Sequence, residues 1–259
     1  MRNVVEYNSS AWDAAVDQGN TWTKPVGSEV IAAAREGTWS VVLTASRPVP
    51  KEWFGDVVGK EVLCLASGGG QQVPVLAAAG ARVTSFDNSA KQLGQDRFVA
   101  ERDGLEIRLE QGDASDLSRF ADGSFDIVFN PCSNCFMPRL QPVWEECFRV
   151  LRSGGVLLVG FTKPDVFIFD WLEEERSGEL KVRFSLPYTD ETSLEPDELA
   201  LVLERNQPLE FSHTLEEQIG GQTTAGFHIV GLYEDHWNDP KRPLDRHMPA
   251  FVATRALKP

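Results

Sequence analysis

Residues 62–70 read VLCLASGGG, a short apolar run that leads through Ala66 and Ser67 into three glycines. An apolar run of this length, bounded by glycine, is typical of a strand buried in a parallel sheet. Residues 71–79 then have helical character and stop at Gly80. The order of strand, glycine turn and helix predicts the start of an open α/β sheet, which binds its ligand where the strands end.

The same alternation continues to about residue 162, with turns rich in glycine, aspartate or serine between the segments. The last two predicted strands have no clear helix between them, which predicts an antiparallel pair at the sheet edge. We therefore predict a Rossmann-like fold, with a seven-stranded, mostly parallel sheet and an antiparallel last strand. The predicted strands are 61–66, 82–86, 106–110, 125–130, 156–161, 227–233 and 251–255, and the main helices are 89–103 and 142–151.

The first 55 residues do not follow this alternation. They hold four of the seven tryptophans, together with helical patches at 9–18 and 27–36. We predict that residues 1–55 form a cap over the main domain, residues 56–259. A helical extension that only covers one face of the sheet explains the composition equally well.

A second irregular segment, residues 163–206, follows the predicted fifth strand. It contains an aromatic run, an acidic stretch, a predicted strand at 180–185 and a helix that begins near Pro196. The segment is too short and too weakly apolar to hold a large core alone. We predict an insertion into the main domain.

Composition narrows the classes of partner. The 259 residues include 25 Lys and Arg against 39 Asp and Glu, a net charge of −14, which argues against a broad nucleic-acid or anionic membrane surface. No apolar stretch approaches the roughly 20 residues of a membrane helix, and the chain start lacks a signal core. These features predict a cytoplasmic protein. Cys132 and Cys135 form a lone C-x-x-C without a second pair, so we predict no metal site.

The glycine turn admits three nucleotide-type ligands. A P-loop requires Lys and Ser or Thr after the last glycine, but Gly70 is followed by two glutamines. A dinucleotide fingerprint fits at Gly68 and Gly70, but Val73 stands where the third glycine is needed. The third ligand is S-adenosylmethionine, which has no pyrophosphate to bind.

Five motifs in order make the chain resemble the class I S-adenosylmethionine-dependent methyltransferases, of the small-molecule group called type 11. The resemblance covers about residues 59–162, and its motifs are the glycine turn at 62–70 and the segments 83–87, 111–114, 125–129 and 149–155. It implies methyl transfer from S-adenosylmethionine, with S-adenosylhomocysteine as the product. Two residues depart from the pattern: Cys64 replaces an acid that often positions the amino end of the cofactor, and Ala66 replaces the first glycine.

The resemblance also assigns residues to the cofactor. Asp87 ends the second strand and is expected to accept both ribose hydroxyls, and Asp113 with Ala114 is expected to hold adenine. Helix capping explains Asp113 equally well. The full predicted set is Ala66, Ser67, Gly68, Gly70, Gln71, Asp87, Asn88, Asp113, Ala114 and Asn130.

The methyl acceptor is expected at the end of the fourth strand, residues 130–136, beneath the cap. We predict a small-molecule acceptor, with Asn130 and His213 as the catalytic residues. His213 has the chemistry of a general base near neutral pH, although a structural histidine at a helix entry fits the sequence as well. Two alternatives stay open from sequence: a non-catalytic protein that binds S-adenosylmethionine, and an NAD-linked oxidoreductase.

Overall fold

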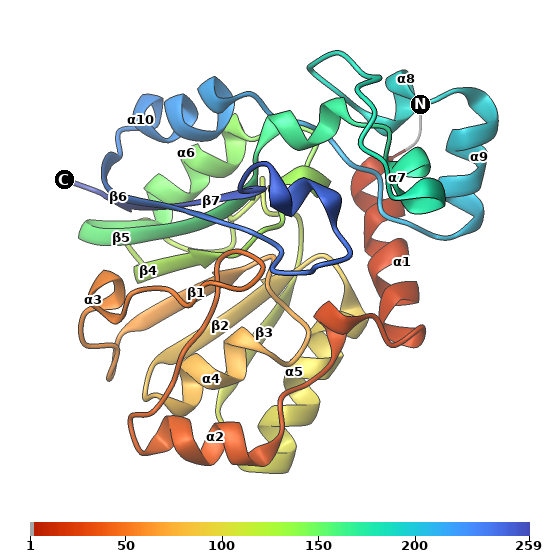
Figure 1. Cartoon of the computed structure of the whole chain (residues 1–259). Helices are drawn as coiled ribbons and strands as arrows, with labels where there is room; N and C mark the ends of the chain where they lie inside the picture. The colour runs from red at the N-terminus through yellow and green to blue at the C-terminus, as the bar shows by residue number, and fades with distance from the viewer. Residues whose placement is uncertain (1–2) are drawn as a thin grey trace.

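Seven strands form one sheet in the computed structural model, which describes residues 3–259. The strand order is β3-β2-β1-β4-β5-β7-β6 (Figure 1). This arrangement confirms the predicted fold class. The strands are β1 (Glu61–Leu65), β2 (Arg82–Asp87), β3 (Ile107–Gln111), β4 (Phe125–Asn130), β5 (Leu151–Thr162), β6 (His228–Asp235) and β7 (Phe251–Leu257).

The pairing pattern fixes where a ligand binds. Strand β1 pairs in parallel with β2 and β4, so the carboxyl ends of these three strands lie side by side at one edge. Strand β7 runs antiparallel to both β5 and β6, as predicted for the last strand. The order along the sheet reverses at β1 and β4, the point where open α/β sheets bind ligands.

Two local predictions were wrong. Residues 152–155, which fall outside the predicted fifth strand at 156–161, lie within β5, where the register with β4 jumps from Phe125↔Leu151 to Ile127↔Val156. The positive φ of Gly154, 78°, accommodates this irregularity. Residues 180–185 form no strand, because only one isolated bridge, Phe169↔Val182, connects them to another segment.

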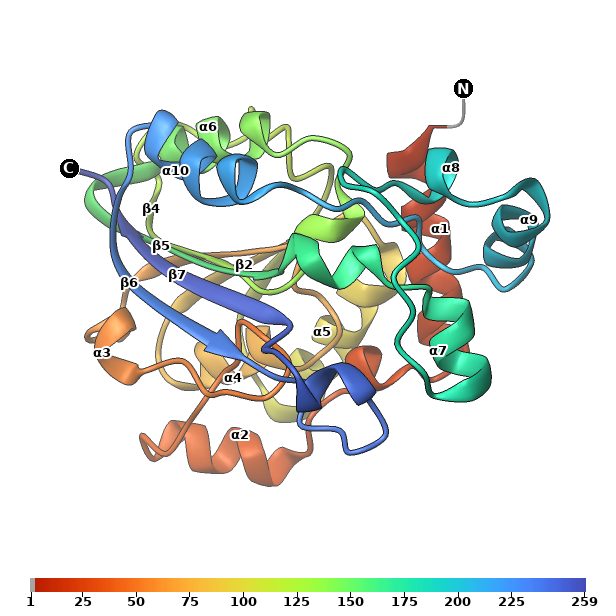
Figure 2. The same ribbon diagram turned by 45° about the horizontal axis from the view of Figure 1, so that its top comes forward.

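Helices cover both faces of the sheet. Figures 1 and 2 show α2, α4 and α5 on one face, α6 and α10 on the other, and α1 with α7–α9 beyond the carboxyl ends of the strands. None of the helices in residues 3–259 has the length and apolar content of a membrane span. The α-helices are α1 (Val4–Asp17), α2 (Ser28–Arg35), α3 (Lys51–Phe54), α4 (Gln72–Ala78), α5 (Ala90–Asp103), α6 (Gln141–Val150), α7 (Trp171–Ser177), α8 (Asp190–Ser193), α9 (Pro196–Glu204) and α10 (Gly221–Thr224).

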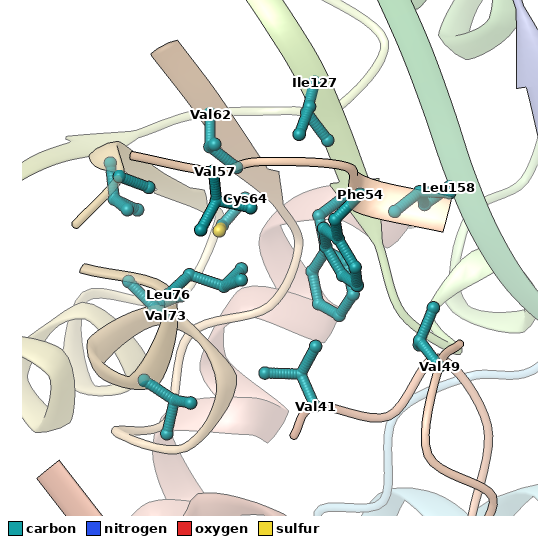
Figure 3. Close-up of a cluster of buried hydrophobic side chains, with 14 of the residues drawn as sticks. Val41, Val49, Phe54, Val57, Val62, Cys64, Val73, Leu76, Ile127 and Leu158 are labelled. Carbon is teal, nitrogen blue, oxygen red and sulfur yellow. The ribbon is translucent and has the colours of Figure 1, made fainter. Parts of the chain in front are cut away.

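The cap prediction covers two structurally different stretches. Helix α1 stands at the carboxyl edge of the sheet, whereas α2 packs against α4 and α5 in the layer over one face. Residues 41–57 contribute Val41, Val49, Phe54 and Val57 to the core on that face, beside Cys64 of β1 (Figure 3). The first 55 residues therefore both border the strand ends and cover a face.

The segment after β5 joins α1 in a small separate core. Phe167, Phe184, Tyr188 and Val202 are buried there with residues 209 and 211. Tyr7 of α1 packs against this cluster. The insertion and the N-terminal helix thus form one wall beyond the ends of β1 and β4.

Candidate cofactor and acceptor site

A cavity of about 760 Å³ opens where β1, β2 and β4 end. Its floor is the glycine turn and the ends of β2 and β3, and its outer walls come from α1, the loop after β4 and the insertion. Ligand sites of small molecules have volumes of this order. The cavity brings together segments from almost the whole chain, from residue 5 to residue 251.

Most of the predicted cofactor residues share this cavity. Gly70 and Asn130 are outside its lining. Asn130 is fully buried; its Nδ2 donates to the Leu65 carbonyl at 3.4 Å, while its Oδ1 has no hydrogen-bond partner in the described part of the chain. The eight residues that line the cavity are Ala66, Ser67, Gly68, Gln71, Asp87, Asn88, Asp113 and Ala114.

The backbone amides of the glycine turn are already used within the protein. The Gly68 amide donates to Asp87 Oδ2 at 3.0 Å, and the Gly69 amide donates to the Gln92 carbonyl at 3.0 Å. The Gly70 amide donates to Asp96 Oδ1 at 2.7 Å. A phosphate-binding turn needs free amides, so this turn is unsuited to the pyrophosphate of a dinucleotide.

Glycine is required in the turn because the N-terminal segment crosses it closely. A Cβ on Gly69 would lie 2.8 Å from the Trp22 carbonyl oxygen, and one on Gly70 would lie 2.9 Å from Pro25 Cβ. Both glycines have positive φ, 123° and 75°. The Gln71 side chain completes the contact, since its Nε2 donates to the Thr21 and Lys24 carbonyls.

The polar groups beside the turn fit S-adenosylmethionine. Asp87 is buried, and its Oδ1 accepts from the Ser89 amide at 2.9 Å. Burial raises the pKa of Asp87 to about 6, although the bonds from the Ser89 and Gly68 amides oppose this rise. Ser67 Oγ and Gln92 Oε1 are buried, neither has a polar nitrogen or oxygen partner within residues 3–259, and both residues line the cavity. A carboxylate and unpartnered polar atoms suit a hydroxyl-rich ligand without phosphate.

The position of Asp113 is compatible with both of its predicted roles, local capping and adenine binding. Its Oδ1 accepts from the Ser115 amide at 2.9 Å, which is a local turn-capping bond. Asp113 and Ala114 also line the cavity next to Phe86. The adenine assignment stays a prediction.

Helix α1 is fastened across the cavity by buried polar contacts. Asn8 is 1% exposed; its Nδ2 donates to the Phe136 and Leu209 carbonyls at 2.9 and 3.0 Å, and its Oδ1 accepts from the Leu209 amide at 2.8 Å. Asp13 Oδ1 accepts from Ser89 Oγ at 2.6 Å. These bonds connect α1 to the loop after β4, to the segment after the insertion and to the start of α5.

The far part of the cavity is aromatic and carries a carboxylate that the sequence did not single out, Glu210. Phe167, Trp171 and Tyr188 line this part. Tyr188 Oη donates to Asp190 Oδ1 at 2.6 Å, and the Glu210 amide donates to Asp190 Oδ2 at 2.7 Å. Asp190 is therefore engaged, whereas no hydrogen bond or ion pair within residues 3–259 reaches the Glu210 carboxylate.

Burial raises the pKa of Glu210 to about 8; the negative charge of Asp190 adds to the rise and Arg242 opposes it. Glu210 also contributes to the raised pKa of the Cys132 thiol, about 12, after burial itself. The Glu210 carboxylate thus lies between the loop after β4 and the insertion. A carboxylate with a raised pKa in a mostly apolar pocket is a candidate general base.

His213 lies outside the cavity lining. Its ring is buried, with Nε2 2.8 Å from the Met137 carbonyl oxygen, so Nε2 is the protonated donor. Burial lowers the pKa of His213. The structure joins His213 to the loop after β4, but it places Glu210, not His213, on the cavity surface.

The four cysteines are free thiols. Cys132 Sγ lies 3.3 Å from Thr162 Oγ1, and burial raises the pKa of both Cys132 and Cys135. In the described part of the chain, no group of three or more His, Cys, Asp or Glu side chains is arranged to hold a metal ion. Unreactive, protonated thiols follow from these pKa values.

A family model described as a methyltransferase domain matches residues 63–159. The chain is 49% identical over 258 residues to "Uncharacterized methyltransferase YbaJ" of Bacillus subtilis, with 100% of both chains covered. It is also 34% identical over 122 residues to a sterol 24-C-methyltransferase of Gibberella zeae, covering 46% of this chain and 32% of that protein.

Among solved structures, the fold is similar to a protein from Listeria monocytogenes described as a putative S-adenosylmethionine-dependent methyltransferase. The TM-score is 0.62 at 17% identity, covering 89% of this chain and 99% of the other. At this identity the likeness concerns the fold alone.

Proposed function

Because the chain belongs to the class I S-adenosylmethionine-dependent methyltransferases, we propose that it methylates a small, largely apolar molecule bound in the aromatic half of the cavity. The observation that carries this proposal is the enclosure of that half. Helix α1, the loop after β4 and the insertion surround it, and the buried Asn8 side chain connects α1 to that loop and to the segment after the insertion.

Enclosure favours a small acceptor over a macromolecule. Trp12 of α1 packs edge-on against Phe136 of the loop after β4, with ring centroids 5.1 Å apart. A protein or nucleic-acid strand would have to displace this contact and the Asn8 bonds. Aromatic walls on several sides also limit the access of water, which otherwise solvates the attacking atom.

Methyl transfer needs alignment and, for many acceptors, removal of a proton. The cofactor supplies an electrophilic sulfonium methyl when bound. On the protein side, Asp87 and the glycine turn would hold the adenosine portion, and the aromatic side chains would orient the acceptor. Glu210 would accept the proton of the attacking hydroxyl or amine, since it lines the cavity and its carboxylate has no hydrogen-bond or ion-pair partner within residues 3–259.

The sterol methyltransferases that are similar to part of this chain are named for an apolar, small-molecule acceptor. That similarity supports the proposed acceptor class without identifying the compound, because it covers less than half of the length of those proteins.

The proposal is tested by measuring S-adenosylhomocysteine formation with defined acceptor panels. One panel holds apolar alcohols, phenols and amines, and the other holds unmodified protein, RNA and DNA. We expect turnover with members of the first panel only. Turnover confined to the second panel would overturn the proposal.

A variant of the acceptor wall gives a second test. Trp171→Ala is expected to raise KM for the acceptor while leaving S-adenosylhomocysteine binding unchanged.

A further inference from the structure

Asp96 is a buried charge whose place in the fold is not explained by stability. It is 0% exposed in the second turn of α5, four residues after Gln92. Its Oδ1 accepts from the Gly70 amide at 2.7 Å and its Oδ2 accepts from Ser85 Oγ at 2.7 Å. No ion pair to Asp96 forms within residues 3–259.

A neutral side chain could form hydrogen bonds to the same two groups with a smaller desolvation free energy. Asparagine offers the same oxygen to the Gly70 amide and an amide to the serine hydroxyl. Burying an unpaired carboxylate carries a desolvation cost that asparagine avoids. An expensive charge at such a place indicates a functional use, because local rules are broken mainly at functional sites.

The position of Asp96 relative to β1 suggests that use. Cys64 of β1 is in register with Ser85 of β2, the serine that donates to Asp96. The charge of Asp96 is the second cause, after burial, of the raised pKa of the Cys64 thiol, so the two side chains are neighbours. Asp96 thus places a carboxylate from α5 beside position 64, directly beneath the glycine turn.

We propose that Asp96 is a positioning residue for the cofactor: it holds the glycine turn through Gly70 and supplies the negative charge that favours the cationic amino and sulfonium end of S-adenosylmethionine. In this chain the charge comes from α5 rather than from β1, where Cys64 stands. Asp96 itself does not line the cavity, so it acts through the turn and through the low-dielectric interior.

The surroundings of Asp96 set a measurable pH dependence. Burial raises its pKa to about 7, the bonds from Ser85 and Gly70 lower it, and the charge of Asp87 raises it. Cys64 from β1 and Asp87 from β2 are the titratable neighbours, and α4 has no titratable side chain. The ionised form binds the cofactor better, so affinity should increase as pH rises through about 7.

Calorimetry with S-adenosylhomocysteine and S-adenosylmethionine between pH 5.5 and 9 tests the proposal on the full chain. At pH 8, Asp96→Asn is expected to weaken binding about tenfold, which corresponds to about 1.4 kcal/mol for a buried charge that acts on the cofactor without touching it. The same variant should lose the increase near pH 7 and keep only the increase near pH 6 that Asp87 causes. Unchanged affinity, or a retained midpoint near 7, would overturn the proposal.

Two further variants keep the test decisive if Asp96→Asn folds poorly. Ser85→Ala removes a bond that lowers the pKa of Asp96, so the midpoint of the pH profile should move upward; a fixed midpoint contradicts the proposal. Cys64→Asp alone places two carboxyls together, which raises the pKa of the pair, so the midpoint of the pH profile should move upward. Cys64→Asp combined with Asp96→Asn moves the charge to β1 and should recover most of the lost affinity, whereas no recovery contradicts the role of the charge.

Discussion

The two halves of the cavity are built in different ways. The cofactor half comes from consecutive βα units, and its key residues follow the ends of β1, β2 and β3 within about 50 residues. The acceptor half combines α1, the loop after β4, the insertion and the segment around residue 210. The cofactor half can therefore be predicted from sequence motifs, whereas the acceptor half depends on tertiary contacts between segments that are distant in the sequence.

The largest expected effect concerns the acceptor half. Glu210→Gln keeps the size and polarity of the side chain but removes the proton acceptor, so turnover should fall about 100-fold or more. S-adenosylhomocysteine affinity should stay within twofold. In the wild-type protein the rate should increase as pH rises through about 8, because the raised pKa of Glu210 leaves the carboxyl protonated below that value.

The measurement is steady-state turnover against pH with an acceptor from the small-molecule panel. Glu174→Gln, another carboxylate of the cavity lining, is the control and should leave the pH profile unchanged. A Glu210→Gln enzyme with the wild-type rate would remove Glu210 from the chemistry and leave the acceptor half as a binding surface only.

The sequence predicted the structure correctly where a local pattern of residues was sufficient to specify it. The apolar run 62–65 followed by glycines predicted β1 and its turn, and Asp87 ended β2 where expected. Asp96 was missed although it gave a signal: it lies three residues before buried Val99, on the face of α5 that packs inward. A charged residue on the inward face of a helix indicates a buried polar contact.

Glu210 gave no such signal, because its neighbours Leu209 and Phe211 suggest only a short alternating strand. The structure shows instead an isolated bridge, Thr189↔Phe211, which brings Glu210 to the cavity by tertiary packing. The predicted strand at 180–185 failed for a related reason. Phe184 is buried in the small core beside α1, Leu180 packs near Leu244 and Phe251, and Val182 is exposed, so these apolar residues are not paired in a sheet.

The second-largest effect is expected in the cofactor half of the cavity, at Asp87. Asp87→Ala removes an acceptor for the ribose hydroxyls and also frees the Gly68 amide, which now donates to it at 3.0 Å. Charge-assisted bonds are worth about 1.5–3 kcal/mol each, but they are not additive, so we expect a 10- to 100-fold weaker S-adenosylhomocysteine affinity. Calorimetry on a folded variant is the measurement, with exposed Asp116→Ala as the control. A wild-type affinity in Asp87→Ala would mean that Asp87 does not bind the cofactor.

A smaller effect is expected where the two halves are joined. Asn8→Ala leaves the Leu209 amide and the Phe136 and Leu209 carbonyls without their partner. Buried unsatisfied groups cost about 1–3 kcal/mol each, and relaxation of α1 reduces the sum, so unfolding free energy should fall by about 2 kcal/mol. Urea unfolding measures it. Ser10→Ala, whose hydroxyl bonds only to Glu6 of its own helix, should change little; equal effects would mean that α1 is not fastened by Asn8.

The smallest effect separates the two explanations of His213. As a structural residue, it donates from Nε2 to the Met137 carbonyl and holds the loop after β4, so His213→Ala should cost about 1 kcal/mol of stability without a specific loss of turnover. His213→Gln distinguishes this role from catalysis, because glutamine retains an N–H donor for Met137 but takes up no proton near neutral pH. Stability restored in His213→Gln together with wild-type turnover fits a ring outside the cavity, neutral because burial lowers its pKa. Restored stability with turnover still reduced would make His213 the base predicted from sequence, and Glu210 would then be limited to binding the acceptor.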